Sequence, residues 1–449
     1  MQKFKIWLLL ILATSLAYGA SLKYGFSQDD WYFLSISRAQ NVSEVFNFFN
    51  PFSQAGFAFF RPLSTQLYYF VFTRVFGLFG SPLYMHIFML ILQGSCGYLV
   101  YLLVTKLKIS HSTALLIALV YATSSAQFLS LFYIAATQQL LSAFFGLLSL
   151  NYFLDKKLWL SSLFFLFALL SKETAIMVPF IAVTLTLLEK PRLSFKQFIP
   201  YLIIFFSYLA MRLVTSSPTQ REYHFAIGFN VVSTLRWYFL FAFGAAEEWI
   251  RYATPAFGIA LPRFVQDFGP LGLSVTVFTI LNFSIFILSL LRNNLRQTVL
   301  YLAWFTLAIA PVLFLLNHRY PHYLDLALIP LLLIVYQFIR GRWQYVLTLL
   351  LVAASLSTIS LSQSVHWTTG RAEMSAQAIS TLDWPTICTH STIAFTGDDP
   401  FPRELSYTLS LANGVRVLCN NPALEVSYLG QGDLYPENAY LVDVGPIFK

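Results

Sequence analysis

Long apolar runs recur along the whole chain, and short polar connections separate them. A helix needs about 20 apolar residues to cross a bilayer. It is also suited to lipid because it satisfies its backbone N–H and C=O groups internally. We therefore predict an all-α polytopic membrane protein with about 11 transmembrane helices. The predicted spans are 4–22, 83–105, 111–130, 133–154, 158–171, 173–188, 197–215, 270–291, 297–316, 322–339 and 343–362.

Composition supports this class and argues against two others. Only 11% of the residues are charged, whereas a soluble protein carries about 25%. The net charge of +8 suggests a nucleic-acid binder, but the basic residues sit in short clusters between apolar runs. Such clusters are typical of cytoplasmic loops. They are Lys3 with Lys5, Lys106 with Lys108, Lys156 with Lys157, Lys190 with Arg192 and Lys196, Arg292 with Arg296, and Arg340 with Arg342.

These clusters orient the predicted helices. If each lies in the cytoplasm, the N-terminus is also cytoplasmic and every second connection faces outwards. The eleven spans then leave the C-terminus outside. We predict a multi-pass protein of the plasma or inner membrane on this basis. Its outer connections are 23–82, a turn near 131–132, 171–173, 216–269 and 317–322.

Two further apolar segments would raise the number of spans to 12 or 13. A span at 57–79 would invert every later connection, so we interpret this segment as helix in the outer interface, with Arg61 and Arg74 at its polar edge. We interpret 231–250 as an amphipathic or re-entrant segment on the outer side. The first apolar run also has features of a signal peptide, but we favour an uncleaved first helix.

The tail, 363–449, has the polar composition of a soluble domain. We predict a small extracytoplasmic α/β domain there, after a membrane domain at 1–362. Short β-like runs surround one helix-like run. The β-like runs are 391–397, 414–420 and 439–445, and the helix-like run is 402–414.

Three cysteines do not form a zinc pattern. Cys96 falls within an apolar run, as a residue of the membrane core does. Cys388 and Cys419 both fall in the tail. They form either a disulfide, which an extracytoplasmic compartment allows, or two buried thiols.

Two adjacent carboxylates, Asp29 and Asp30, follow the first apolar run. The structural interpretation is a helix start at which Ser27 or Asp29 caps free backbone N–H groups. The functional interpretation rests on the aromatic run that follows. A carboxylate held at an aromatic-rich interface is partly desolvated, which raises its proton affinity and suits a general base.

Basic groups fall in the same set of outer connections. Lys172 and Glu173 follow an apolar run too short for a full span, and ionisable residues at such a depth usually face a cavity. Arg61 belongs to Phe60-Arg-Pro-Leu63. The segment 317–323 contributes His318, Arg319, Tyr320 and His322, which could bind an anionic headgroup. The alternative for each group is ordinary interfacial anchoring. Pro321 interrupts the helical spacing that His318 and His322 would need to share a metal, so we predict no metal site.

Four stretches together resemble the C-fold glycosyltransferases, which include the protein O-mannosyltransferases and the bacterial lipid A aminoarabinose transferases. Asp29-Asp-Trp-Tyr-Phe-Leu-Ser-Ile-Ser-Arg38 resembles their first external loop, which carries an Asp-Glu pair. FFRPLSTQLYYFVF resembles the Arg-Pro-Leu segment of the tetratricopeptide-linked O-mannosyltransferases. Leu170-Ser-Lys-Glu-Thr-Ala-Ile176 and His318-Arg-Tyr-Pro-His-Tyr323 resemble their Ser-Lys-Glu and Arg-Tyr segments. The resemblance covers about residues 1–340, with 1–215 matching the fold's constant module and 216–362 forming a variable module.

The resemblance implies an inverting transferase that uses a polyprenyl-phosphate-linked sugar. The family's catalytic Asp corresponds to Asp29, and Asp30 stands where relatives often have Glu. This departure leaves open which carboxylate takes the acceptor proton. Arg61, Lys172, His318 and Arg319 are the candidates for the lipid phosphate. The tail lacks tetratricopeptide repeats, so that subfamily's acceptor is not carried over.

The predicted function is therefore sugar transfer from a lipid-phosphate donor to an acceptor hydroxyl on the extracytoplasmic face. The expected catalytic residues are Asp29 and Asp30. The expected partners are the lipid-linked donor, membrane lipid and an acceptor protein, glycan or lipid, without nucleic acid. No cofactor is required, because a monophosphate leaving group reduces the need for a divalent cation. The expected substrate-binding residues are Arg61, Lys172, Glu173, His318, Arg319, Tyr320 and His322.

Two alternatives belong to other classes. A lipid or solute transporter would show duplicated halves and charges near the middle of its spans, whereas the charges here fall at one face. A surface-polysaccharide polymerase or ligase would place Arg and His residues in a large later loop. The region 216–269 keeps that alternative open. Its charged residues include Arg221, His224, Glu247, Glu248 and Arg251.

Overall fold

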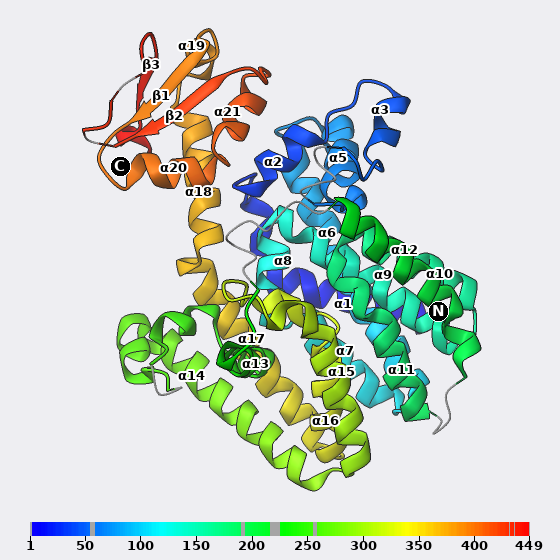
Figure 1. Ribbon diagram of the computed structural model, residues 1–449. Helices are drawn as coiled ribbons and strands as arrows, with labels where there is room; N and C mark the ends of the chain where they lie inside the picture. The colour runs from blue at the N-terminus through cyan, green and yellow to red at the C-terminus, as the bar shows by residue number, and fades with distance from the viewer. Residues whose placement is uncertain are drawn as a thin grey trace.

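The structure is a computed structural model that describes residues 2–53, 59–189, 194–215, 225–254, 258–430, 432–434 and 436–448. It consists of a helical bundle and a smaller α/β region, joined by the helix α18 (Trp367–Thr381) (Figure 1). Some residues singled out above lie outside the described ranges. They are Lys190, Arg192, Arg221, His224 and the first two residues of 57–79.

Among the described residues, seven helical segments are long and apolar enough to cross a membrane, which confirms a polytopic membrane protein. They are α1 with η1 (Gln2–Lys23), α6 (Ser81–Lys106), α7 with α8 (His111–Phe132), η6 with α12 (Phe195–Thr215), α14 (Leu261–Arg292), α15 (Leu295–Leu313) and α17 (Trp343–Val365).

The other four predicted spans also form helices, but these are shorter or less apolar. They are α9 (Thr137–Leu154), α10 (Leu158–Ser171), α11 (Val178–Glu189) and α16 (Leu328–Phe338). Every residue of α16 from Leu328 to Tyr336 is buried. A helix that is apolar on all sides belongs in the interior of a bundle, and α16 accordingly packs among α7, α14 and α15.

The two ambiguous segments form helices too short for a span. The first gives the π-helical turn η2 (Pro62–Leu67) and α5 (Tyr68–Phe76), and the second gives α13 (Phe229–Ala242). At 1.5 Å per residue, helices of this length fall short of a hydrocarbon core of about 30 Å. The helices α10, α11 and α16 are of similar length, so whether the two segments span stays a prediction.

The helix α1 packs closely against α6. A Cβ atom at Gly94 would lie 2.6 Å from the Cα of Ile11, so only glycine allows this approach. Two hydrogen bonds fix the same helix. Trp7 Nε1 donates to Ser95 Oγ at 3.0 Å, and Thr14 Oγ1 donates to the carbonyl of Ala122 at 3.3 Å.

Basic connections from different parts of the chain meet at one end of the bundle. The contacts are Lys106 Nζ with Asp155 Oδ1 at 2.9 Å, Lys156 Nζ with Glu189 Oε2 at 3.6 Å, and Arg296 with the carbonyl of Leu187 at 3.0 Å. This end is the one that the positive-inside rule assigns to the cytoplasm.

The C-terminal region is an α/β unit around a parallel sheet with strand order β2-β1-β3. The central strand carries the buried residues Ile393, Ala394 and Phe395. Burial on both faces is typical of a parallel sheet. The strands are β1 (Thr392–Thr396), β2 (Glu425–Leu429) and β3 (Tyr440–Asp443), and the helices after α18 are α19 (Trp384–Ile387), α20 (Phe401–Thr408) and α21 (Ala412–Leu418).

One predicted strand is wrong. Residues 414–420 belong largely to α21, and the strand beside β1 is 425–429. Two parallel neighbours need a crossover connection, which is usually helical. The helices α20 and α21 supply that connection between β1 and β2, so this apolar run is used as helix. The other two predicted strands, and the helix within 402–414, are present.

Cys388 and Cys419 form a disulfide, and Cys96 is a buried free thiol. The disulfide closes a loop of 31 residues in sequence, and such a loop contributes about 2–4 kcal/mol by restricting the unfolded chain. We expect the double variant C388S/C419S to lose hydrogen-exchange protection in β1 and β2 while α6 and α16 keep theirs. Unchanged protection in the strands would contradict this.

Candidate functional site

Asp30 is buried at the first turn of α2 (Asp29–Ile36). Its carboxylate accepts hydrogen bonds from the backbone N–H of Ser27 at 2.9 Å and from the hydroxyl of Tyr69 at 2.6 Å. Burial raises the pKa of Asp30 to about 8, although both hydrogen bonds oppose that shift. The side chain therefore anchors the turn that begins α2.

Asp29 occupies the same turn but is exposed. Its backbone N–H donates to the hydroxyl of Tyr133 at 2.9 Å, and its carboxylate is close enough to affect both Tyr133 and Tyr32 electrostatically. Capping by Ser27 or Asp29 is not observed. The N-cap residue is Gln28, and Asp30 is the residue that reaches back to Ser27. The structure thus gives the two carboxylates different environments.

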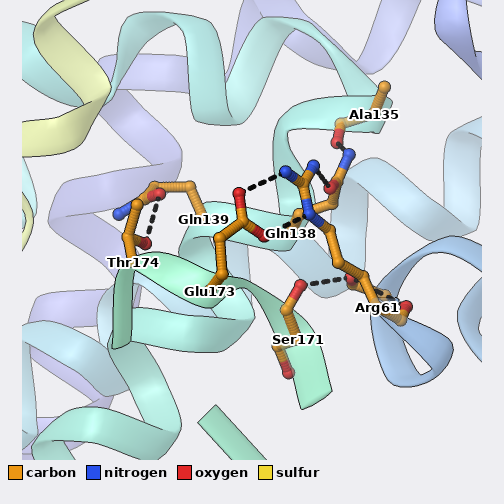
Figure 2. Close-up of polar contacts among 8 residues, drawn as sticks. Arg61, Ala135, Gln138, Gln139, Ser171, Glu173 and Thr174 are labelled. Atoms are coloured by element: carbon orange, nitrogen blue, oxygen red, sulfur yellow. Dashed lines mark hydrogen bonds and ion pairs between the residues drawn. The ribbon is translucent and has the colours of Figure 1, made fainter. Parts of the chain in front are cut away.

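Arg61 and Glu173 form an ion pair, which joins two of the predicted segments (Figure 2). Arg61 Nε donates to Glu173 Oε2 at 2.7 Å, and Arg61 also donates to the side-chain oxygen of Gln138. The Arg61 side chain is only 6% exposed. With these partners, Arg61 positions the surrounding segments.

The ion pair is connected to Asp30 through η4 (Ile134–Ala136). The backbone of Ala135 lies close enough to the Asp30 carboxylate to lower its pKa. The carbonyl of the same residue accepts from Gln138 Nε2 at 2.8 Å. A single short turn therefore fixes the relative positions of the carboxylate pair and the Arg61–Glu173 pair.

Lys172 is buried next to the later loop. Its Nζ lies 4.7 Å from the centroid of the Tyr323 ring, a cation–π arrangement. His322 is buried and its ring lies 4.3 Å from the same Tyr323 ring. Tyr320 stacks on His322 at 5.7 Å. The Ser-Lys-Glu and Arg-Tyr segments thus contact each other.

A cavity of about 350 Å³ opens beside this cluster. Arg319 lines it, and the buried Nε of Arg319 has no hydrogen-bond partner among the described residues. The cavity also contains an ion pair between His366 Nε2 and Glu247 Oε2, 3.3 Å apart. Its charged and aromatic lining residues are Glu247, Glu248, Arg251, Arg319, Tyr320, His366 and Trp367.

Trp367 connects this cavity to Asp29. Its ring lies 6.0 Å from that of Tyr133, whose hydroxyl accepts the Asp29 N–H, and 6.4 Å from that of Tyr320. The exposed carboxylate and the cavity lined by Arg319 are therefore separated by two aromatic rings.

The C-terminal region contacts the same loop. The backbone N–H of Gln28 donates to the carbonyl of Thr408 at 2.6 Å. Arg371, on α18, donates to the side chain of Gln28 at 2.8 Å. Arg38, just past α2, donates to Asn420 at 3.1 Å. The α/β unit therefore covers the residues on either side of the carboxylate pair.

His318 is held by contacts of both its side chain and its backbone. Its side chain is buried against Tyr320, with 5.8 Å between the ring centroids, and its carbonyl accepts a hydrogen bond from the hydroxyl of Tyr238 at 3.2 Å.

Within the described part of the chain, no three His, Cys, Asp or Glu side chains gather in a way that could hold a metal ion.

Several residues of the site are not predicted from the sequence. Tyr69, Tyr133 and Gln138 lie in apolar runs that give no polar signal. His366 and Trp367 directly follow the last predicted span, and this position at the outer end of a helix could have indicated that they belong to the site. Glu247 and Glu248 were noted only for the ligase alternative, and they line the cavity described here.

Comparisons with known proteins complete the description. No protein-family model and no curated protein matches this chain. The solved structures similar to it include the archaeal oligosaccharyltransferase AglB from Archaeoglobus fulgidus in complex with an inhibitory peptide and a dolichol-phosphate, at 12% identity and a TM-score of 0.48. The match covers 96% of this chain and 64% of that chain.

Two further structures of the Archaeoglobus fulgidus oligosaccharyltransferase are similar. The apo form matches at 12% identity and a TM-score of 0.49, over 96% of this chain and 64% of that chain. The complex with Zn and sulfate matches at 12% identity and a TM-score of 0.47, over 95% and 62%. This chain thus spans less than two thirds of the length of these proteins.

Proposed function

We propose that this protein is an integral membrane inverting glycosyltransferase that transfers a sugar from a polyprenyl-phosphate donor to an acceptor hydroxyl. One observation carries the proposal. The exposed Asp29 lies two aromatic rings away from a cavity lined by the cationic side chain of Arg319. A general base and a nearby anion site are the two parts that this reaction needs.

The reaction assigns a role to each part. The Asp29 carboxylate takes the proton of the acceptor hydroxyl, whose oxygen attacks the anomeric carbon of the sugar. The bond from that carbon to the phosphate oxygen breaks with its electron pair, so the lipid phosphate leaves as an anion. Attack opposite the leaving group inverts the configuration. Arg319 and Lys172 stabilise the negative charge that develops on the phosphate.

The proposal includes an orientation. The basic clusters meet at the other end of the bundle from Asp29, and the positive-inside rule assigns them to the cytoplasm. The site and the C-terminal α/β unit then face the extracytoplasmic side, where a disulfide is stable.

The test is transfer of a radiolabelled sugar from a panel of polyprenyl-phosphate donors by the purified full-length protein in liposomes. The expected result is transfer with inverted anomeric configuration from at least one donor. Binding of the lipid donors without transfer to any acceptor in the panel would instead favour the transporter alternative.

Arg319→Gln is expected to weaken catalysis through the donor phosphate. A hydrogen bond to a charged group contributes about 1.5–3 kcal/mol, so kcat/KM for the donor should fall roughly 10- to 100-fold. The matched control is Arg263→Gln, which removes an exposed arginine at the start of α14. Equal activity of the two variants would remove Arg319 from the phosphate site.

A further inference from the structure

A second polar cavity, of about 390 Å³, lies at the opposite end of the bundle from Asp29. The helix α17 runs from this cavity to the candidate site and so gives the separation between them. It begins at Trp343, next to this cavity, and ends at Val365, next to His366 of the candidate site. Its 23 residues correspond to about 34 Å of helix. The second cavity is therefore a separate site.

Three cationic side chains line this cavity, each from a different connection of the bundle. Lys108 follows α6, Arg292 ends α14, and Arg340 lies between α16 and α17. No Asp or Glu is among the described residues that line the cavity. All three cations are exposed. The cavity thus concentrates positive charge without an internal counter-charge.

The helices add to this charge. Ser110 and Asn294, which line the cavity, are the N-caps of α7 and α15, and Gln344 lies in the first turn of α17. The N-terminal ends of helices carry partial positive charge and favour anions. Three helix starts and three cationic side chains therefore surround one space.

The walls of the cavity are held in place by hydrogen bonds between helices. Gln344 accepts from Thr113 of α7 at 2.9 Å and donates to the carbonyls of Tyr336 and Ile339 at 3.0 and 2.9 Å. Asn293 Nδ2 donates to the carbonyl of Ile334 at 2.7 Å. The space is therefore built before any ligand arrives, which lowers the cost of binding.

We propose that this cavity binds an anionic phosphate group at the basic end of the bundle. Basic pockets between transmembrane helices on the cytoplasmic side bind the headgroups of anionic lipids. The same chemistry would accept a free phosphate. This inference does not depend on the proposed transferase activity, because it uses other residues at the other end of the bundle.

The test measures how much phosphatidylglycerol the wild type and two variants retain after purification from mixed phosphatidylcholine and phosphatidylglycerol. Native mass spectrometry detects the bound lipid. The variant R292Q/R340Q removes two of the three charges. The control K157Q/K196Q removes two basic residues that do not line the cavity. At about 1 kcal/mol per charge, R292Q/R340Q should bind phosphatidylglycerol roughly thirtyfold more weakly. The control should match the wild type.

Further experiments identify the ligand and control for misfolding of the variants. Competition by millimolar inorganic phosphate would indicate a free-anion site, whereas unaffected retention would indicate a lipid headgroup; either supports the proposal. R292K/R340K keeps the charges and should restore retention. If R292Q/R340Q fails to fold, K108Q gives the same comparison with one charge removed. Equal phosphatidylglycerol retention by the folded cavity variants and the control would overturn the proposal.

Discussion

Replacing Asp29 by Asn should lower the rate of sugar transfer by about 100- to 10,000-fold, the range in which a positioned general base contributes. The substitution keeps the size of the side chain and the backbone N–H that donates to Tyr133. Because Asp29 is exposed, the protein should fold and melt as the wild type does. The measurement is the rate of transfer by the purified variant in liposomes at saturating donor.

Two controls separate the base from its neighbours. Glu44→Gln changes an exposed carboxylate on α3 (Val42–Asn47), in the same outer loop, and should leave the rate unchanged. Asp30→Asn should chiefly reduce thermal stability, because an amide has one oxygen for the donors that Asp30 serves. A full rate in Asp29→Asn, with a rate lost in a folded Asp30→Asn, would reverse the assignment.

Arg61→Met should reduce both stability and transfer. Removing one partner of a buried ion pair costs about 3–5 kcal/mol. We expect about 3 kcal/mol because the Glu173 side chain is 42% exposed. The loss of the contacts to Gln138 and Glu173 should shift the turn at Ala135, which lies beside Asp30. A displacement of about 1 Å can cost a hundredfold in rate. Thermal unfolding and transfer are measured on the same preparation.

The double variant R61M/E173L tests this interpretation. It removes both charges of the ion pair together, and well-packed apolar replacements of an ion pair are often neutral. We expect it to recover most of the stability lost in R61M. Stability lost equally in the single and double variants would show that the ion pair does not account for the effect.

Sequence reasoning reached the architecture because lipid permits few backbone structures. Apolar length and basic clusters were enough to place α1, α6 and α17 and to group the polar connections. They did not distinguish α16, whose burial on every side depends on its neighbours. The run at 414–420 alternates as a strand does, and only the need for a crossover between β1 and β2 makes it a helix.

The candidate site was partly predictable from the polar residues that stand between the apolar runs. The sequence indicated Asp29 and Asp30 as a pair of carboxylates. Nothing in the sequence distinguishes the two, and only the fold shows that Asp30 is buried and Asp29 is exposed. Arg61 was expected to bind a phosphate. The fold pairs it with Glu173, 112 residues away in sequence, and no local pattern shows such a pairing. Tyr133 and Trp367 were missed because aromatic residues are common in every membrane protein.

The contacts between Gln28 and the C-terminal region have a consequence for biosynthesis. Arg371 and Gln28 are 343 residues apart in sequence, and Arg38 and Asn420 are 382 apart. A ribosome adds about 5–20 residues per second, so the outer loop waits on the order of 20 s or more for these partners. During translation the loop beside Asp29 lacks these contacts, and they form only after the C-terminal α/β unit has been made and folded. A chain stopped before α18 would thus keep the membrane bundle but leave this loop without the contacts that Arg371, Thr408 and Asn420 supply.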